Sequence, residues 1–579
     1  MTESVDCANI ITSEDYADFI VKRSERVLES YKNDPNACVE IVNADWMIVH
    51  APYSKEAGIN VGTSGYFRIP KLLTVMDTTS MEASGITAVQ NQPALDLRGQ
   101  GVIIGFVDTG IDYTNQVFQF TRNRSKIEAI WDQTQPWNAD NTEIHEQYPN
   151  VHYGNIYTNE QINQALEAKE RGEDPYNIVP TTDDAEGHGT FMAGIAAGRS
   201  IDEQFIGAAP DATILMVKLK PAKTYLRDFY LIKKVAIAYQ ANDVMMGVRF
   251  LLDYANKAKK PLVICIGLGT NMGPHSIGTP LGIYLNSVAN TVGVVVVTCT
   301  GNETDKRHHY SGLKNDDQTF IPVEVFVGEN STGFTLELWG KSPEFFSVAI
   351  VSPSGEEIQR VPIRSGSSSI INFIFERSII RLDYRVVEVL SGDELVLMRF
   401  QFPTQGIWTI RVYGISGITG VFNMWLPVEG FLNTDTYFIE SSPYTTLTEP
   451  SPAAQTLTVA GYEHQNMSLF VSSGRGYTAD GRVKPDLAAP AVNVYGPAPG
   501  GRFVYRTGTS IAAAHVAGAA ALLLTWGVVR GNNSLMSTST VKNILIRGAR
   551  RDNSLTYPNR EWGYGELDLI QAFERLSQN

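Results

Sequence analysis

From about residue 101, the hydrophobic residues come in short runs, each followed by glycine or polar residues and then by a helical stretch. Strands buried on both faces of a parallel sheet have this continuous apolar character, whereas half-exposed strands alternate. The pattern therefore predicts an α/β unit with a parallel sheet and helices on both of its faces. The runs lie at 102–107 (VIIGFV), 212–219 (ATILMVKL), 261–266 (PLVICI) and 292–298 (VGVVVVT).

Residues 310–450 have a different pattern. Short strand-like segments recur there, turn residues separate them, and convincing helices are missing. This predicts an antiparallel β-sandwich inserted into the α/β unit, whose own pattern returns at about residue 456 and runs to a helix near 567–577. The strand-like segments are 334–339, 346–351, 370–375, 394–402, 408–413 and 421–426.

The first 65 residues predict a further, smaller α/β unit. Residues 17–31 have helical periodicity, and residues 38–50 have the character of a strand. Residues 54–66 (SKEAGINVGTSGY) are rich in Gly and Ser, which is typical of a linker or an exposed loop. Another helical stretch is expected at 84–97.

The composition excludes several classes of partner. Of the 579 residues, 43% are hydrophobic and 19% are charged, so we expect packed domains rather than a disordered chain. The 47 Lys and Arg against 62 Asp and Glu give a net charge of −15. A surplus of acid argues against nucleic acid as the main partner and against anchoring on anionic lipid.

Cysteines and apolar runs exclude further possibilities. Four cysteines in 579 residues are too few for a disulfide framework, and no Cys/His cluster has zinc spacing. The acidic N-terminal residues lack the basic and apolar regions of a secretory signal. The most apolar run, 292–297, is far shorter than a membrane span. We therefore expect an intracellular protein with no membrane span.

Three short segments carry candidate chemistry. Asp108 follows an apolar run and precedes a glycine turn, at the edge where open α/β sheets place their sites. His188 lies between two glycines at the start of a helix of small residues. Ser510 opens the helix 511–524, where the positive end of the helix dipole favours negative charge developing on an attacked carbonyl.

Each segment alone also has a simpler explanation. An Asp after a strand often only caps a turn, a His at a helix start can pack under a loop, and a Ser there is most often an N-cap. Together, the order Asp108, His188, Ser510 within these flanks resembles the subtilisin-like serine proteases, the subtilase family. The resemblance covers 95–305 and 455–575.

Further motifs extend this resemblance. Gly267-Leu268-Gly269 is similar to the Ser-Leu-Gly strand that binds substrate in the family, with Gly in place of Ser. Asn302 lies in the segment that supplies the oxyanion-hole amide. The usual proline after the nucleophile is replaced by Ala514, which affects packing rather than the reactive groups. The segments 207–210 (GAAP) and 484–490 (KPDLAAP) also match the family pattern.

The resemblance implies a role for each candidate residue. His188 would accept the proton of Ser510 and then donate it to the leaving amine, while Asp108 holds the imidazole. Asn302 and the backbone N–H of Ser510 would bind the oxyanion. The backbone at 267–269 would pair with an extended substrate. This chemistry requires no cofactor.

Other candidate ligands and histidines are interpreted as structural. His515 lies inside the helix that Ser510 opens, so we expect it to pack rather than react. His308 and His309 begin the insertion and are expected at the surface. Subtilases often bind calcium, but no Asp/Glu cluster can be assigned as its ligands here.

The resemblance also assigns the domains. Residues 1–65 are similar to a subtilase prodomain, which assists folding, occupies the active-site cleft and is cut off by the enzyme itself. We expect this cut between residues 62 and 79. Residues 66–309 and 451–579 then form the two parts of the catalytic domain, on either side of the sandwich at 310–450.

This layout resembles the clostridial Csp-type germination proteases, in which the insert is a jelly roll and the prodomain stays bound. The resemblance implies a cytoplasmic or spore-associated endopeptidase that activates a protein precursor, namely that of a spore cortex-lytic enzyme. Two alternatives remain open: a pseudoprotease that works as a binding or signalling module, and a general intracellular peptidase. The sequence leaves the substrate, the cleavage specificity and the oligomeric state open.

Overall fold

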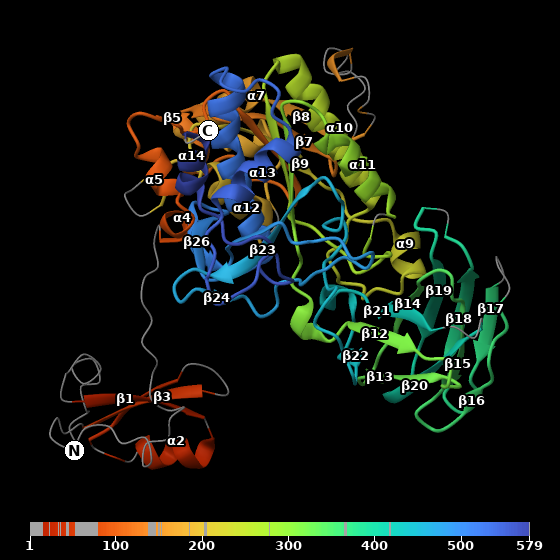
Figure 1. Ribbon diagram of the computed structural model, residues 1–579. Coiled ribbons are helices and arrows are strands. Elements are labelled where there is room, and N and C mark those ends of the chain that lie inside the picture. Colours follow the sequence, from red (N-terminus) through yellow and green to blue (C-terminus); the bar gives the residue numbers. More distant parts are fainter. Residues whose placement is uncertain are drawn as a thin grey trace. The chain divides into compact units, whose positions relative to one another are not determined.

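The structure, a computed structural model, contains two compact units, Met1–Val75 and Met76–Asn579 (Figure 1). It describes residues 16–22, 24–32, 34, 36–41, 46–52, 79–136, 146–148, 151, 153–183, 186–201, 205–276, 278–363, 368–388, 390–415 and 419–577.

The first unit is a three-stranded antiparallel sheet with one helix. Strands β1 (Tyr16–Lys22), β3 (Trp46–Pro52) and β2 (Cys38–Ile41) pair in that order, and α2 is Glu25–Lys32. Val21, Leu28, Met47 and Val49 form its core.

Two expectations for this unit are corrected by the structure. The helix predicted over 17–31 is a strand up to Lys22, because its apolar residues at 17, 19 and 21 alternate as a strand requires. The strand predicted over 38–50 is two strands, β2 and β3, that pair antiparallel. The predicted linker at 54–66 lies outside the described residues.

The second unit is built on a sheet of nine strands. Its central strands run parallel in the order β23-β11-β10-β4-β9-β7, and β25 also pairs parallel with β23. The antiparallel strands β24 and β8 close the two edges. The strands are β4 (Ile103–Asp108), β7 (Ile127–Asp132), β8 (Asn155–Thr158), β9 (Thr213–Lys218), β10 (Leu262–Ile266), β11 (Val294–Cys299), β23 (Leu457–Glu463), β24 (Ser468–Leu469) and β25 (Leu487–Pro490).

Helices cover both faces of this sheet, as the apolar runs predict. On β10, Val263 and Cys265 face a core shared with α8, α12, α13 and α14, whereas Leu262 and Ile264 face a core shared with α10 and α11. In Figure 1, α10 and α11 are yellow-green and the C-terminal helices are blue. The helices are α8 (His188–Ala197), α10 (Ala241–Ala258), α11 (Pro280–Ala289), α12 (Thr509–Leu524), α13 (Thr538–Gly548) and α14 (Leu569–Ser577).

Helix α12 runs through the core that it shares with α8, α13 and α14. All of its residues are buried, and it is rich in Ala, which lets neighbouring backbones approach closely. With the following π turn η6 (Thr525–Val529), it is long and apolar enough to cross a membrane by length and composition. Its most apolar window is 89% buried inside the protein, which is the environment of a core helix.

The segment between β11 and β23 in the chain forms a separate β-sandwich. One sheet has the order β12-β21-β14-β19-β18-β17 and the other β16-β15-β20-β13-β22, all antiparallel, around a core of its own. Nested pairs β12–β21, β13–β20 and β14–β19 alternate between the sheets, which is a jelly-roll arrangement. The strands are β12 (His309–Lys314), β13 (Ile321–Val327), β14 (Gly333–Gly340), β15 (Phe346–Val351), β16 (Glu357–Ile358), β17 (Ser368–Asn372), β18 (Ile379–Arg385), β19 (Glu394–Gln401), β20 (Gly406–Gly414), β21 (Gly420–Trp425) and β22 (Thr436–Phe438).

Short elements complete the second unit. The helix predicted over 84–97 is interrupted: Gly85 has a left-handed φ of 68° between two short helices, and turns follow after Gln90. The short elements are α4 (Thr79–Ala83), α5 (Ile86–Gln90), η2 (Gln116–Phe118), β5 (Gln119–Thr121), β6 (Arg124–Ser125), α7 (Asn159–Glu170), η3 (Pro175–Asn177), α9 (Thr224–Phe229), η4 (Thr304–Lys306), η5 (Glu429–Phe431), β26 (Val494–Ala498) and β27 (Arg502–Arg506).

The close packing of α12 gives a test of this core. A Cβ at Gly518 would overlap the Cβ of Ala208 and lie 2.8 Å from the carbonyl oxygen of Ala196 in α8. We expect Gly518→Ala to lower stability by about 1–3 kcal/mol, although alanine has the better helix propensity. The measurement is the urea unfolding midpoint in a Ser510→Ala background, which excludes self-digestion.

The control for this substitution is Gly430→Ala. Gly430 lies in η5 with nothing within 4 Å of an added Cβ. The free energy of unfolding of this variant should therefore stay within about 0.5 kcal/mol of the parent's, with nearly the same urea midpoint. Equal midpoints for the two variants would contradict the packing described for α12.

Candidate active site

Three neighbouring parallel strands bring predicted residues to one edge of the sheet. Asp108 is the last residue of β4, Gly267 follows the end of β10, and Asn302 lies three residues beyond the end of β11. Because β4, β10 and β11 are adjacent and parallel, their carboxyl ends share one edge.

Two helices begin at the same edge. His188 is the first residue of α8, and Ser510 is the second residue of α12. Gly187 has a left-handed φ of 69°, and a Cβ on Gly189 would overlap the carbonyl oxygen of Gly110. The glycines around His188 therefore allow the start of α8 to approach the loop after β4 closely.

The structure brings Asp108, His188 and Ser510 into one chain of hydrogen bonds. His188 Nδ1 lies 2.7 Å from Asp108 Oδ1, and His188 Nε2 lies 3.0 Å from Ser510 Oγ. The backbone N–H of Thr109 also donates to Asp108 Oδ1, at 2.8 Å. Asp108 is 1% exposed, while the His188 side chain is 29% exposed, so the imidazole is the member of the chain that solvent reaches.

The surroundings of His188 set its proton affinity. Burial lowers the pKa of the imidazole, but the charge of Asp108 and the hydrogen bond to it raise the pKa, and the net result lies above the ordinary 6.5. Asp183 raises this pKa further and Arg506 lowers it. His188 can therefore take up a proton readily, as a general base must.

Asn302 has its amide oriented by α12. Its Oδ1 accepts hydrogen bonds from the backbone N–H of Thr509 (3.0 Å) and from the Thr509 hydroxyl (3.1 Å). Nδ2 is left as the donor on the other side of the amide. A Cβ placed on Gly508 would lie 3.5 Å from Ser510 Oγ and 3.6 Å from Asn302 Nδ2, so the absent side chain leaves space between these two groups.

The residues of the predicted substrate strand lie directly beside these groups. A Cβ on Gly267 would lie 3.1 Å from His188 Cε1 and 3.1 Å from Ser510 Cβ, so the backbone at Gly267 lies directly against both residues. A Cβ on Gly269 would overlap the hydroxyl of Thr448. Leu268 packs against the core that α10 and α11 share.

The expectation that His308 and His309 are surface residues is wrong. They are 5% and 1% exposed, because the sandwich packs on the catalytic part at this point. His308 Nδ1 lies 2.7 Å from Glu303 Oε2, and the ring of Trp425 stacks on His309 at 4.8 Å. Both histidines are therefore buried at this junction, although Asp305 and Arg307 in the preceding turn are exposed.

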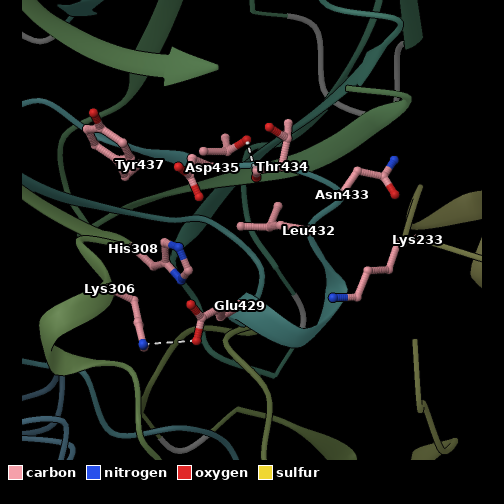
Figure 2. Close-up of a pocket in the computed structure, with 10 residues that line it drawn as sticks. Lys233, Lys306, His308, Glu429, Leu432, Asn433, Thr434, Asp435 and Tyr437 are labelled. Carbon is pink, nitrogen blue, oxygen red and sulfur yellow. Dashed lines mark hydrogen bonds and ion pairs between the residues drawn. The ribbon is translucent and has the colours of Figure 1, made fainter. Parts of the chain in front are cut away.

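A polar hollow of about 230 Å³ opens at the same junction, away from the three hydrogen-bonded residues. Figure 2 shows His308 beside this hollow and Lys306 paired with Glu429. Lys306 Nζ lies 3.0 Å from Glu429 Oε2. Lys233, Leu432, Asn433, Thr434, Asp435, Thr436 and Tyr437 complete the lining. No Ser or Cys lines this hollow, so it offers no nucleophile of the predicted kind.

The remaining predictions concern His515 and metal ions. His515 is fully buried, with Nδ1 2.9 Å from the carbonyl oxygen of Ile511 and Nε2 3.1 Å from Ser80 Oγ, so it packs between α12 and α4. Among the residues that the structure describes, no three His, Cys, Asp or Glu are grouped so that they could hold a metal ion. Calcium binding stays a prediction.

Sequence reasoning missed several residues that shape the site. Thr509 orients the Asn302 amide, Thr448 lies against the substrate strand, and Asp183 lies behind His188. The sequence offers a signal for Asp183 alone, because it belongs to an acidic pair five residues before the histidine. The other two act through contacts between segments far apart in the chain.

Comparison with known proteins matches this geometry. The model of the subtilase family matches residues 99–326 and 436–565, which include the first and last strands of the sandwich and leave out most of it. The solved structure of the Clostridium perfringens CspB protease is similar with a TM-score of 0.75 and 31% sequence identity, over 86% of this chain and 97% of that one.

Two curated proteases are also similar. The C5a peptidase of Streptococcus pyogenes serotype M1 is 20% identical over 513 residues, which are 82% of this chain and 39% of that protein. The mouse membrane-bound transcription factor site-1 protease is 34% identical over 142 residues, 23% of this chain and 13% of that protein. The chain thus spans about two fifths of the first protein's length and less of the second's. Since the family model matches more than half of its residues, the chain belongs to the subtilase family of subtilisin-like serine proteases.

Proposed function

We propose that this protein is an active serine endopeptidase in which Asp108, His188 and Ser510 form the catalytic triad. The observation that carries the proposal is the unbroken chain of hydrogen bonds, 2.7 Å from Asp108 to His188 and 3.0 Å from His188 to Ser510. A serine hydroxyl is a weak nucleophile, and a base within this distance is what activates it.

The reaction then has two halves. Ser510 Oγ attacks the peptide carbonyl while His188 Nε2 takes its proton, and the same proton passes to the nitrogen as the C–N bond breaks. Water attacks the acyl-enzyme with His188 again as the base. Asp108 keeps the imidazole in the tautomer with Nδ1–H and stabilises the imidazolium.

The oxyanion would be bound between Asn302 Nδ2 and the backbone N–H of Ser510. The position of Ser510 in the first turn of α12 supports this, because the free N–H groups and the dipole of a helix start favour negative charge. Thr509 supports it as well, since it holds the amide oxygen of Asn302 and so leaves the amide N–H₂ as donor. The backbone of Gly267–Gly269 would pair with the substrate chain.

We further propose that the enzyme cuts its own chain between residues 62 and 79, releasing the N-terminal unit as a prodomain that binds the active-site cleft. This segment lies outside the described residues apart from Thr79. The separation of the chain into Met1–Val75 and Met76–Asn579 supports a boundary there. Similarity to the CspB protease supports a role in proteolysis. The resemblance of the domain layout to the Csp-type germination proteases suggests that the substrate is the precursor of a spore cortex-lytic enzyme.

Two other functions lead to different outcomes of the same experiments. A pseudoprotease that only binds a partner needs no working nucleophile, and a general peptidase would degrade an unfolded protein such as casein to small peptides. The intact hydrogen-bond chain favours catalysis over the first. Discrete cleavage of a cortex-lytic enzyme precursor, with casein left largely intact, would favour the proposed role over the second.

Self-cleavage is the first test. We expect the purified wild-type chain to split into a fragment of about 60–80 residues and a large remainder on an SDS gel, whereas Ser510→Ala stays whole because the nucleophile is gone. N-terminal sequencing of the large fragment locates the bond. A wild-type chain that stays whole and does not react with a fluorophosphonate would favour the pseudoprotease.

Gly508→Ala tests the oxyanion site. The backbone of Gly508 is extended (φ 164°) and its Cβ would meet only ordinary contact distances, so the variant should fold. The methyl group would occupy the space between Ser510 Oγ and Asn302 Nδ2. We expect kcat to fall by about 100-fold or more, similar to Asn302→Ala; loss of one such donor costs about 100- to 1000-fold, a magnitude established on subtilisin itself.

The matched control is Gly430→Ala, a glycine on the sandwich side of the chain with open space around its Cβ. Its kcat should equal that of the wild type. Wild-type kcat for Gly508→Ala would contradict the position assigned to the oxyanion.

The pH dependence follows from the raised pKa of His188. Below that pKa the imidazole is protonated and cannot accept the proton of Ser510, so the rate is low and rises as the pH increases through it. We expect the rate of Ser510 labelling by a fluorophosphonate to rise between pH 5 and 9 with a midpoint above 6.5. Circular dichroism checks that the fold persists; a rate that is flat or falls across this range would count against His188 as the base.

A further inference from the structure

A second buried carboxylate lies behind the proposed triad. Asp183 is 5% exposed and precedes His188 by five residues. The hydroxyl of Thr109 donates to its Oδ1 and the backbone N–H of Thr190 donates to its Oδ2, each at 2.5 Å. Neither of these two hydrogen bonds involves Ser510.

Its two partners flank the two acid–base residues. Thr109 directly follows Asp108, and its N–H donates to Asp108 Oδ1, the same oxygen that lies 2.7 Å from His188 Nδ1. Thr190 lies two residues after His188 in the first turn of α8. The Asp183 carboxylate therefore joins the end of β4 to the start of α8.

The Thr109 hydroxyl contacts both Asp183 and the start of α8. It donates to Asp183 and accepts a hydrogen bond from the backbone N–H of Gly189, at 3.0 Å. The N-cap residue of α8, Gly187, has no side chain that could cap the helix. Asp183 supplies the cap instead, because it accepts the N–H of Thr190, and its negative charge suits the helix start.

The charge of Asp183 reaches His188. Burial raises the pKa of Asp183, the hydrogen bonds from Thr109 and Thr190 lower it, and the charge of Asp108 raises it, so that the pKa is about 6. Asp183 in turn raises the pKa of His188, whereas Arg506 on β27 lowers it. Lys218 on β9 faces the same segment, with its ammonium group donating to the carbonyl oxygen of Thr182 at 2.8 Å.

We propose that Asp183 is a positioning residue of the active site: through Thr109 and Thr190 it fixes the end of β4 against the start of α8, and so holds His188 on Asp108. The inference rests on the proposed function, because it assigns Asp183 a part in the same reaction. Asp183 also keeps a negative charge near the imidazole, which a purely structural cap would not need.

The deciding variant is Asp183→Asn. The Asn carbonyl oxygen can accept the N–H of Thr190, and the Thr109 hydroxyl can rotate to accept from the Asn amide, so the fold is retained while the charge is lost. We expect the titration midpoint of His188 to fall by about 0.5–1 pH unit. In the active enzyme, the acid limb of kcat should move down by the same amount. Asp183→Ala, which removes both acceptor oxygens, should in addition reduce kcat about tenfold with KM within a factor of two.

The titration is measured by NMR on full-length Ser510→Ala protein with histidine labelled at ¹³Cε1, and His188→Gln assigns the resonance. This readout needs no peptidase activity, so failure of the proposed function and failure of this inference are distinguishable. Asp112→Asn is the matched control. Asp112 is buried like Asp183, with 1% exposure, and accepts hydrogen bonds from the N–H (3.0 Å) and the hydroxyl (2.8 Å) of Thr114. In Asp112→Asn, the titration midpoint of His188 should equal that in the parent protein.

A second variant, Thr109→Val, tests the same inference if Asp183→Asn does not fold. Thr109→Val removes the hydroxyl that stabilises the charged form of Asp183, so the carboxylate should be less ionised near neutral pH and the midpoint of His188 should fall. An unchanged midpoint in Asp183→Asn, or in Thr109→Val where the first variant is unfolded, would overturn the inference, and so would a wild-type kcat in folded Asp183→Ala. So would an equal fall in Asp112→Asn.

Discussion

The parallel register of β4, β10 and β11 is the constraint on which the whole site depends. It brings Asp108, the proposed substrate strand after Ile266 and the segment of Asn302 to one edge, and α8 and α12 begin at that edge with His188 and Ser510. No single segment contains more than one of the reacting groups. Their geometry is therefore a property of the sheet, and the small residues of α8 and α12 are what allow both helices to pack on it.

Much of this architecture could be predicted from the chain alone. Continuous apolar runs identify strands covered on both faces, and the observed alternation on β10, with Val263 on one side and Ile264 on the other, shows why such runs carry no polar positions. The residues Asp108, His188 and Ser510 could be selected because their flanking glycines and helix starts are local features. The sequence does not give the distances between these three residues, because the distances depend on how segments far apart in the chain pack together.

The misses have a common physical cause. Residues 17, 19 and 21 fit a strand, while 17 and 21 also fit one helix face, so local periodicity does not decide between them. His308 and His309 are polar residues at a domain boundary, a pattern typical of surface, but Glu303 and Trp425 from other segments cover them. The closeness of Gly267 to His188 and Ser510 likewise follows only from the packing of segments that are far apart in the chain.

The inserted sandwich also bears on how the chain can fold. Strands β11 and β23 are neighbours in the main sheet although the whole sandwich separates them in the sequence. Its two ends are held together, because β12 pairs with β21 and the N–H of Ser442 donates to the carbonyl oxygen of His309 at 2.8 Å. Once the sandwich has formed, β23 can reach β11 with the conformational entropy cost of a short connection rather than of a long open loop.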